Sequence, residues 1–225
     1  MSSSPFDPPF KALPDELAVF PLPGALLLPG RQLALNIFEP RYLAMVEDAL
    51  AGKRLIGMIQ PRLDQLPLGG DVGAGPLYRC GCLGRIVEFR ETQDRRYLIS
   101  LNGLCRFDVQ AELDPVKGYR RAAVSWADYE ADMASPDHPP LELPRARLLD
   151  ALRRYLDQQQ LDADLAGLED AEDLQIVDTL VMACPFSTPE KQALLEAPSL
   201  QARADTLITI LEMTMLQDQD GKVRH

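Results

Sequence analysis

The sequence has few of the residues on which hydrolytic or redox chemistry usually depends. Its two histidines are His138, in a proline-rich stretch, and His225, the last residue. A histidine that acts as a general base must be held by a rigid scaffold, and neither position provides one. The four cysteines contain no CxxC pair, so we expect buried, reduced thiols rather than disulfides or a zinc site. We therefore expect a non-enzymatic protein with no catalytic residue, no metal and no cofactor.

Long apolar runs and an excess of basic charge are also missing. No uncharged apolar run reaches the roughly 18 residues of a membrane-spanning helix, and the N-terminus lacks the pattern of a secretory signal. The net charge of −11 disfavours binding to a phosphate backbone. We expect a cytoplasmic protein that binds neither membrane nor nucleic acid.

The hydrophobic pattern changes from period two to period 3.6 along the chain, which predicts an α+β fold in two parts. We expect a disordered N-terminal arm over residues 1–13 and a β-rich barrel over 14–130. A proline-rich linker over 131–144 leads to a helical bundle over 145–217 and a flexible tail over 218–225.

Several features of the β-rich part have specific local interpretations. Residues 54–60 form a short apolar run typical of a buried strand. Residues 77–90 form a strand too long to stay flat, with Gly81 and Gly84 where it could bend. Asn102 and Gly103 predict a tight hairpin turn, because both central residues of a type I′ turn need positive φ.

One helix is expected within the β-rich part. Pro40 suits the first helical position, and Gly52 is typical of a helix end. Between them an apolar stripe at helical spacing predicts a helix packed on the barrel; its members are Tyr42, Met45, Val46, Ala49 and Leu50. In the C-terminal part, Ser187 to Glu190 fits a capping box that begins another helix.

The apolar run at residues 20–30 is interrupted by Pro21, Pro23 and Pro29, so it cannot be an ordinary central strand. It either fills the core or leaves an apolar groove for recognition of a partner.

Five segments, in this order, resemble the N-terminal substrate-binding domain of the ATP-dependent Lon protease, and more closely the stand-alone bacterial proteins made of that domain. They are V-F-P-L-P-G-A-L-L-L-P-G (19–30), L-N-I-F-E-P-R-Y (35–42), L-Y-R-C-G-C-L-G-R-I (77–86), L-N-G-L-C-R-F (101–107) and P-F-S-T-P-E-K-Q-A-L-L-E (185–196). The resemblance implies a PUA-like β pseudo-barrel with one packed helix, followed by a C-terminal helical bundle.

The resemblance also implies a module that captures unfolded polypeptide or a partner protein and helps an oligomer to assemble, so weak self-association is possible. The sequence contains neither the phosphate-binding motif of the Lon ATPase nor its Ser-Lys protease domain. The residues expected to bind peptide are Phe20, Leu22, Leu27, Phe38, Glu39, Arg41 and Tyr42. Two alternatives stay open: a small-ligand binder or enzyme that uses the barrel mouth, and an RNA-binding PUA-like protein.

Overall fold

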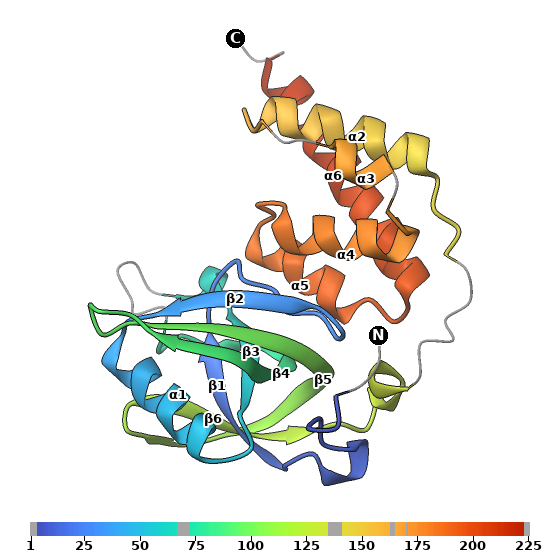
Figure 1. The fold of residues 1–225 in the computed structure, drawn as a ribbon. Helices are drawn as coiled ribbons and strands as arrows, with labels where there is room; N and C mark the ends of the chain where they lie inside the picture. Colours follow the sequence, from blue (N-terminus) through green and yellow to red (C-terminus); the bar gives the residue numbers. More distant parts are fainter. Residues whose placement is uncertain (1–3, 67–72, 135–140, 163–164, 170, 223–225) are drawn as a thin grey trace. The chain divides into compact units, whose positions relative to one another are not determined.

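The computed structural model describes residues 4–66, 73–134, 141–162, 165–169 and 171–222. The chain forms two compact units, Met1–Pro136 and Asp137–His225. The first unit contains the strands and one long helix, and the second contains the remaining helices (Figure 1). The predicted α+β fold is confirmed.

Six strands form one sheet in the first unit (Figure 1). They are β1 (Glu16–Pro21), β2 (Gln32–Ile37), β3 (Leu55–Pro61), β4 (Leu77–Glu91), β5 (Tyr97–Val116) and β6 (Tyr119–Ser125). The order is β2-β5-β4-β3-β1-β6, and β5 also pairs with β6. This last pairing closes five strands into a ring, with β2 attached outside it on β5. Only β1 and β3 run parallel to each other among these pairs.

Glycines in β4 let the long strands bend around the core. A Cβ at Gly81 would lie 2.4 Å from the Phe107 ring and 2.6 Å from the Met58 carbonyl oxygen. The register of β4 against β5 shifts between Leu83 and Gly84. The register shift is an irregularity beside Gly84, one of the two predicted positions, and Gly81 is required by the close approach of a ring and a neighbouring backbone.

The predicted hairpin at Asn102 and Gly103 is wrong, because β5 runs unbroken through both residues. Gly103 is instead required by close packing: a Cβ there would lie 2.1 Å from the Leu28 carbonyl oxygen. The chain reverses later, between β5 and β6, where Lys117 and Gly118 have φ of 48° and 85°.

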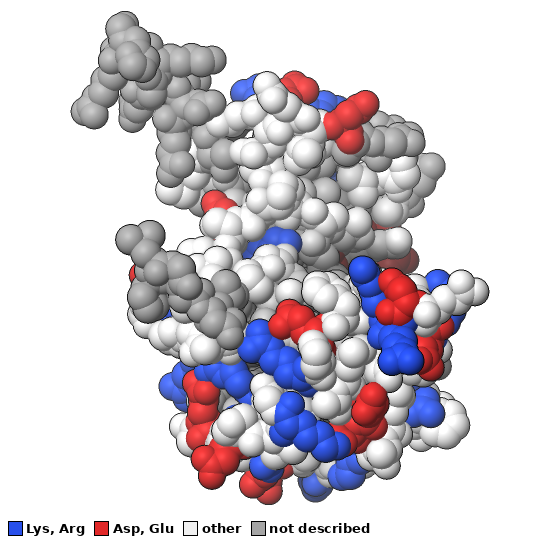
Figure 2. Space-filling view, turned by 90° about the vertical axis from the view of Figure 1, so that its left-hand side faces the viewer, with Lys and Arg blue, Asp and Glu red and all other residues white. Residues whose placement is uncertain are grey.

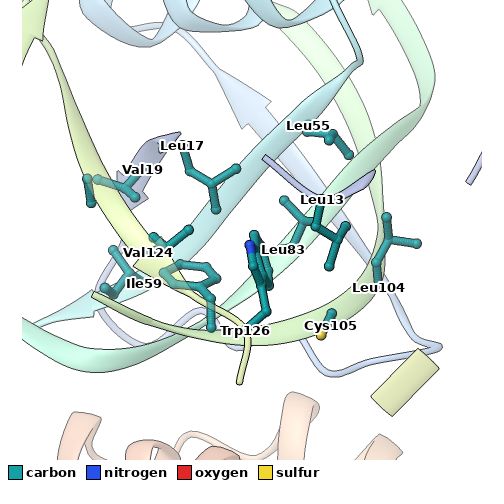
Figure 3. Packing of buried hydrophobic residues seen from close by; sticks show 12 residues of the cluster. Leu13, Leu17, Val19, Leu55, Ile59, Leu83, Leu104, Cys105, Val124 and Trp126 are labelled. Carbon is teal, nitrogen blue, oxygen red and sulfur yellow. The ribbon is translucent and has the colours of Figure 1, made fainter. Parts of the chain in front are cut away.

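The core of the first unit lies inside the ring of strands (Figure 3). Trp126 packs edge-on against Phe107 with ring centroids 5.9 Å apart, and its indole N–H donates to the Pro14 carbonyl oxygen over 3.1 Å. The members of the buried cluster are Leu13, Leu17, Val19, Leu55, Ile59, Leu83, Leu104, Cys105, Phe107, Ala122, Val124 and Trp126.

The N-terminal segment differs from the expected disordered arm over the part that the structure describes. Phe10–Ala12 form a 3-10 turn, and Leu13 is buried in the core cluster. Asp7 accepts a hydrogen bond from Arg85 Nε over 2.6 Å, with both side chains about nine-tenths buried. An ion pair between distant positions cannot be inferred from a Ser- and Pro-rich composition.

Helix α1 (Pro40–Ala51) begins and ends where the sequence predicts, with Pro40 in its first turn and Gly52 after it. Tyr42, Met45 and Val46 of the predicted stripe are buried, whereas Ala49 and Leu50 are only half-buried. The amphipathic helix thus covers part of the sheet.

The second unit consists of α2 (Arg145–Gln158), α3 (Ala166–Glu169), α4 (Asp173–Ala183), α5 (Thr188–Glu196) and α6 (Leu200–Lys222). The capping box at Ser187 and Glu190 is present at the start of α5. α6 continues past residue 217, where we expected the helical bundle to end. Among the described residues, no helix combines the length and apolarity needed to cross a membrane.

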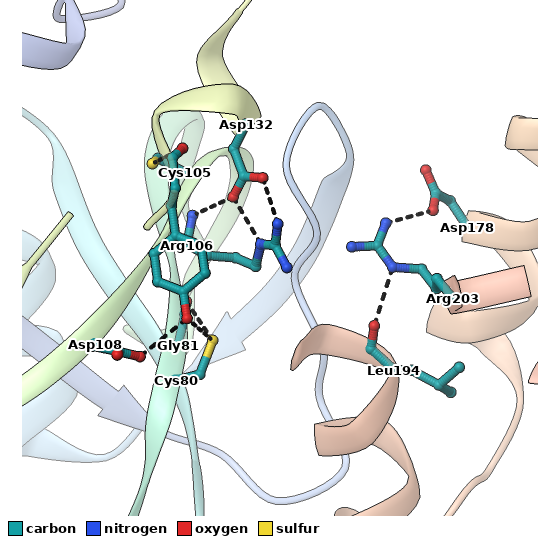
Figure 4. A network of polar contacts seen from close by, with 10 residues as sticks. Cys80, Gly81, Cys105, Arg106, Asp108, Asp132, Asp178, Leu194 and Arg203 are labelled. Atoms are coloured by element: carbon teal, nitrogen blue, oxygen red, sulfur yellow. Dashed lines mark hydrogen bonds and ion pairs between the residues drawn. The ribbon is translucent and has the colours of Figure 1, made fainter. Parts of the chain in front are cut away.

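A buried ion pair connects three helices of the second unit (Figure 4). Arg203 on α6 contacts Asp178 on α4 over 3.3 Å, and both side chains are more than nine-tenths buried. Arg203 Nε also donates to the Leu194 carbonyl oxygen of α5 over 3.1 Å. The predicted proline-rich linker over residues 131–144 begins within a 3-10 turn, Glu130–Met133. Residues 135–140 of this linker lie outside the described residues.

Candidate functional site

The candidate site is the α1 corner, which we define as residues 38–42, where β2 ends and α1 begins. Ile37, the last residue of β2, is buried, and the next residue, Phe38, is 59% exposed. Glu39 is extended, with φ −72° and ψ 133°, as expected for a residue before proline. The corner therefore turns its first side chain toward solvent and its fifth, Tyr42, into the core.

Phe38 is one of the few large apolar side chains that the described structure leaves open to solvent. The Arg96 guanidinium carbon lies 5.6 Å from the centre of its ring, a distance at which a cation is attracted to an aromatic face. Arg96 thus partly orients the ring without burying it. Such a ring can contribute apolar contact area to a partner.

Glu39 and Arg41 form a local ion pair at the same corner. Arg41 donates from Nε and from one terminal nitrogen to the same Glu39 oxygen, over 3.1 and 2.9 Å. A Cβ at Gly73 would lie 2.6 Å from the Arg41 guanidinium, so the Gly73 backbone packs directly on it. Arg41 is therefore a packing residue of the corner as well as part of its rim.

The other predicted site residues lie at different depths. Phe20 and Tyr42 are each 5% exposed, with ring centroids 4.2 Å apart, and Leu27 is 1% exposed. These three side chains belong to the core beneath the surface and do not line it. Leu22 is half-buried, and its backbone N–H donates to the Ile59 carbonyl oxygen over 3.1 Å.

The apolar run at residues 20–30 mainly fills the core. Leu26, Leu27 and Leu28 are all nearly inaccessible. A Cβ at Gly84 would lie 2.8 Å from Leu27, which shows how closely this leucine meets the sheet. Of the two interpretations of the run, core filling therefore holds for these leucines.

A second aromatic pair, which the sequence analysis missed as a surface feature, joins the ends of β4 and β5. The Phe89 and Tyr97 ring centroids are 5.0 Å apart, and Phe89 is 44% exposed. The Tyr97 hydroxyl donates to Glu47 of α1 over 2.8 Å, and this bond, with burial, raises the pKa of Tyr97. Tyr97 also pairs in register with Ile37. The pair thus lies at the same end of the sheet as the α1 corner.

An open hollow of about 240 Å³ lies between α1, β1 and β6. Two carboxylates line it: Glu16, which is ion-paired with Arg121, and Asp48, which accepts hydrogen bonds from Lys117 over 2.6 Å and from Tyr119 over 2.9 Å. These two bonds lower the pKa of Asp48. An ion-paired carboxylate of lowered pKa is a weak proton acceptor, so this hollow offers little support for a general base at the barrel mouth.

The cysteines are buried and unreactive in character. Burial raises the pKa of Cys105 to about 12 and that of Cys184 to about 11, so both thiols stay protonated near neutral pH. Cys80 and Cys82 are also buried. No group of three or more potential metal ligands occurs among the described residues.

A polar network beside these thiols has a structural role (Figure 4). Asp132 accepts hydrogen bonds from Nε, Nη2 and the backbone N–H of Arg106, all within 2.9 Å. Tyr129 donates to Asp108 over 3.1 Å, and its hydroxyl lies 3.5 Å from Cys80 Sγ. The network fastens the 3-10 turn after β6 onto β4 and β5.

The distribution of surface charge bears on the RNA-binding alternative. On the face of Met1–Pro136 seen in Figure 2, Lys and Arg lie among Asp and Glu and do not form a continuous basic stripe. Recognition of a nucleic-acid backbone depends on clustered basic residues. This face therefore gives no support to the RNA-binding alternative.

Comparison with known proteins gives matches that cover most of the chain. The family model described as "ATP-dependent protease La (LON) substrate-binding domain" matches residues 16–213. The chain is 27% identical to Lon protease 2 of Myxococcus xanthus and 28% identical to Lon protease 2 of Sorangium cellulosum, with 88% of this chain covered in each case. Each match covers 24% of the relative, so the chain spans about a quarter of the length of these curated relatives.

Two solved structures resemble the fold of this chain. The Lon N-terminal domain protein from Xanthomonas campestris is 26% identical, with a TM-score of 0.58 and coverage of 86% of this chain and 97% of that chain. The N-terminal domain of the Mycobacterium avium complex Lon protease, at 15% identity and a TM-score of 0.57, covers 88% of this chain and 98% of that chain. The second likeness concerns the fold alone.

Proposed function

Since the chain belongs to the LON substrate-binding domain family, we propose that it is a non-catalytic module that binds unfolded polypeptide or an exposed segment of a partner protein. The observation that carries this proposal is the exposed ring of Phe38, held at the end of β2. Contiguous apolar patches on a folded surface commonly mark interaction sites, and Phe38 lies at the same end of the sheet as a second exposed ring, Phe89. Phe38 is the proposed anchor for an apolar residue of the bound segment.

The neighbouring residues have supporting parts in this proposal. Glu39 and Arg41 form a partly exposed rim beside the ring, and Leu22 is half-buried. Phe20 and Tyr42 pack against each other beneath the corner and keep its backbone rigid. A rigid support lowers the entropy lost when a partner binds.

The candidate reactive groups of this chain support a binding role better than a catalytic one. All four thiols are buried, burial raises the pKa of Cys82, Cys105 and Cys184, and both carboxylates in the hollow are already ion-paired. The relatives are named Lon proteases, and this chain corresponds to about a quarter of each. Proteolysis therefore belongs to those proteins, and the proposal for this chain is limited to binding.

The proposal is tested with fluorescein-labelled peptides from carboxymethylated casein, which stay unfolded, titrated with the protein while anisotropy is recorded. We expect binding, and a several-fold weaker Kd for Phe38→Ala. Phe6→Ala is the matched control, because Phe6 is 80% exposed but lies in the N-terminal segment. Absence of binding at about 100 µM protein, which corresponds to a binding free energy weaker than about −5.5 kcal/mol, would refute the proposal.

A further inference from the structure

β2 differs from the other described strands in having a single neighbour. It pairs only with β5, whereas each of the other five strands pairs with two or more (Figure 1). A strand with one neighbour leaves half of its backbone N–H and C=O groups outside the ladder. Among the described strands, the outer edge of β2 is therefore the place where a further strand could be added along the full length of a strand.

The hydrogen bonds at the start of β2 establish which backbone groups face outward. Gln32 lies opposite Asn102 in the antiparallel register, which sets Arg31 opposite Gly103. The Gly103 N–H donates to the Arg31 carbonyl oxygen over 2.8 Å, so this carbonyl group faces β5 and the Gln32–Asn102 pair beside it is of the non-hydrogen-bonded type. Hydrogen-bonded and non-hydrogen-bonded pairs alternate along an antiparallel ladder.

This alternation shows, for the residues of β2, whether the backbone groups face β5 or the outer edge. Leu33 and Leu35 direct their backbone groups toward β5, and their side chains are half-buried. Gln32, Ala34 and Asn36 direct their backbone N–H and C=O groups toward the outer edge, and their side chains are exposed. This edge thus presents three donors and three acceptors at regular spacing.

The edge also lacks the features with which proteins usually block strand addition. The sequence of β2, Q-L-A-L-N-I, contains no charged residue and no proline, and its register with β5 has no bulge. Charges, prolines and bulges are the common protections of an exposed edge. Without them, an incoming strand meets neutral side chains and a regular row of hydrogen-bonding groups.

We propose that the outer edge of β2 binds an extended, uncharged segment of unfolded polypeptide as an additional strand. This inference rests on the proposed function and specifies how the segment is held. Backbone hydrogen bonds give affinity without a demand for sequence, which suits a module that must accept many unfolded chains. We expect the segment to be uncharged, because β2 has no charged side chain that could form an ion pair with it. Phe38, directly after the strand, then contacts an apolar residue near the end of the segment.

The experiment uses the full chain and a fluorescein-labelled decapeptide of alternating valine and threonine. A second peptide carries N-methyl groups on four successive central residues, which blocks both of its edges. A third peptide replaces four valines with isoleucine, which adds the same methyl groups to side chains. We expect the N-methylated peptide to bind at least about tenfold more weakly and the isoleucine peptide to bind as well as the parent.

Two protein variants test the same edge from the other side. Ala34→Pro removes one outward N–H but no ladder bond to β5, and Ala34→Ser retains that N–H. We expect weaker peptide binding for the proline variant alone, provided that circular dichroism shows an unchanged fold. If the proline variant does not fold, the N-methylated peptide still tests strand addition, because it is used with the unmodified protein.

The outcomes separate this inference from the proposed function. Equal binding of the parent and N-methylated peptides would overturn strand addition and leave peptide binding in place. Failure of the parent and of the casein peptides to bind would overturn both. Sedimentation of the unliganded protein as a dimer that Ala34→Pro converts to a monomer would assign the edge to a second copy of the chain and overturn the peptide as its occupant.

Discussion

The carbonyl oxygen of Leu28 lies 2.1 Å from the point that a Cβ at Gly103 would occupy, so the two segments meet backbone to backbone. Gly103 donates its N–H to Arg31 over 2.8 Å and accepts from the N–H of Gly30 over 2.9 Å. This contact fixes the segment before β2 onto β5, and it thereby sets the position of the α1 corner at the other end of β2.

The first prediction follows from this contact. Gly103→Ala forces the Leu28 backbone away from β5, and we expect a loss of about 1–3 kcal/mol in the free energy of unfolding, the usual cost of overpacking. Gly52→Ala is the control, because its Cβ would lie at an ordinary 3.5 Å from the Asp48 carbonyl oxygen. Urea denaturation of both variants is the measurement. Equal stability of Gly103→Ala and the parent protein would contradict the observed approach.

Gly103 also shows where sequence reasoning succeeds and where it fails. The start of α1 at Pro40 and the capping box at Ser187 depend on neighbouring residues alone, and both were predicted correctly. The need for glycine at position 103 arises from Leu28, 75 positions earlier in the chain (103 − 28). A local pattern of Asn and Gly cannot distinguish such a contact from a turn.

The candidate site was predictable only in part for the same reason. The sequence grouped the apolar residues around positions 20–42 but could not separate buried rings from exposed ones. Tyr42 points inward because it lies on the apolar stripe of α1, whereas Phe38 precedes the helix and follows the buried Ile37. Phe89 packs against Tyr97 of another strand, so no local signal could reveal this aromatic pair.

The second prediction separates site residues from core residues by stability. Phe38→Ala should change the free energy of unfolding by less than about 0.5 kcal/mol, because the ring is 59% exposed. Leu27→Ala should cost about 2–5 kcal/mol, because Leu27 is 1% exposed and would leave a cavity. Thermal and urea denaturation measure both. A large loss of stability for Phe38→Ala would mean that weaker peptide binding by that variant reflects unfolding.

The third prediction concerns the buried ion pair of the second unit. Asp178→Ala leaves the Arg203 guanidinium buried without its carboxylate, and we expect a loss of about 3–5 kcal/mol. Asp150→Ala removes the exposed i,i+4 pair with Arg154, whose side chains are more than half exposed, and should cost at most about 0.5 kcal/mol. Similar losses for the two variants would show that solvent reaches Arg203. Chemical denaturation followed by helical circular dichroism makes the comparison.

Lys191 on α5 gives a pH-dependent prediction. Its side chain is 4% exposed, and its Nζ donates to the Met182 carbonyl oxygen over 3.2 Å. Burial lowers the pKa of Lys191 below its ordinary 10.5. Between the folded pKa and 10.5 the unfolded chain binds more protons than the folded one, so stability rises with pH in that window. The cost of burying the charge is fully present below the folded pKa and disappears as the pH approaches 10.5.

Lys191→Met removes this titration while it keeps an unbranched side chain of similar length. We expect the stability of the parent protein, measured by urea denaturation and compared with that of the variant at each pH, to increase from pH 7 to pH 10. Burial raises the pKa of Cys184 from its ordinary 9.0 to about 11, so this thiol lowers stability as the pH rises above 9, but the variant contains the same thiol and the effect cancels in the comparison. A stability difference that does not change with pH would mean that Lys191 titrates equally in the folded and unfolded chains, and that its ammonium group reaches solvent.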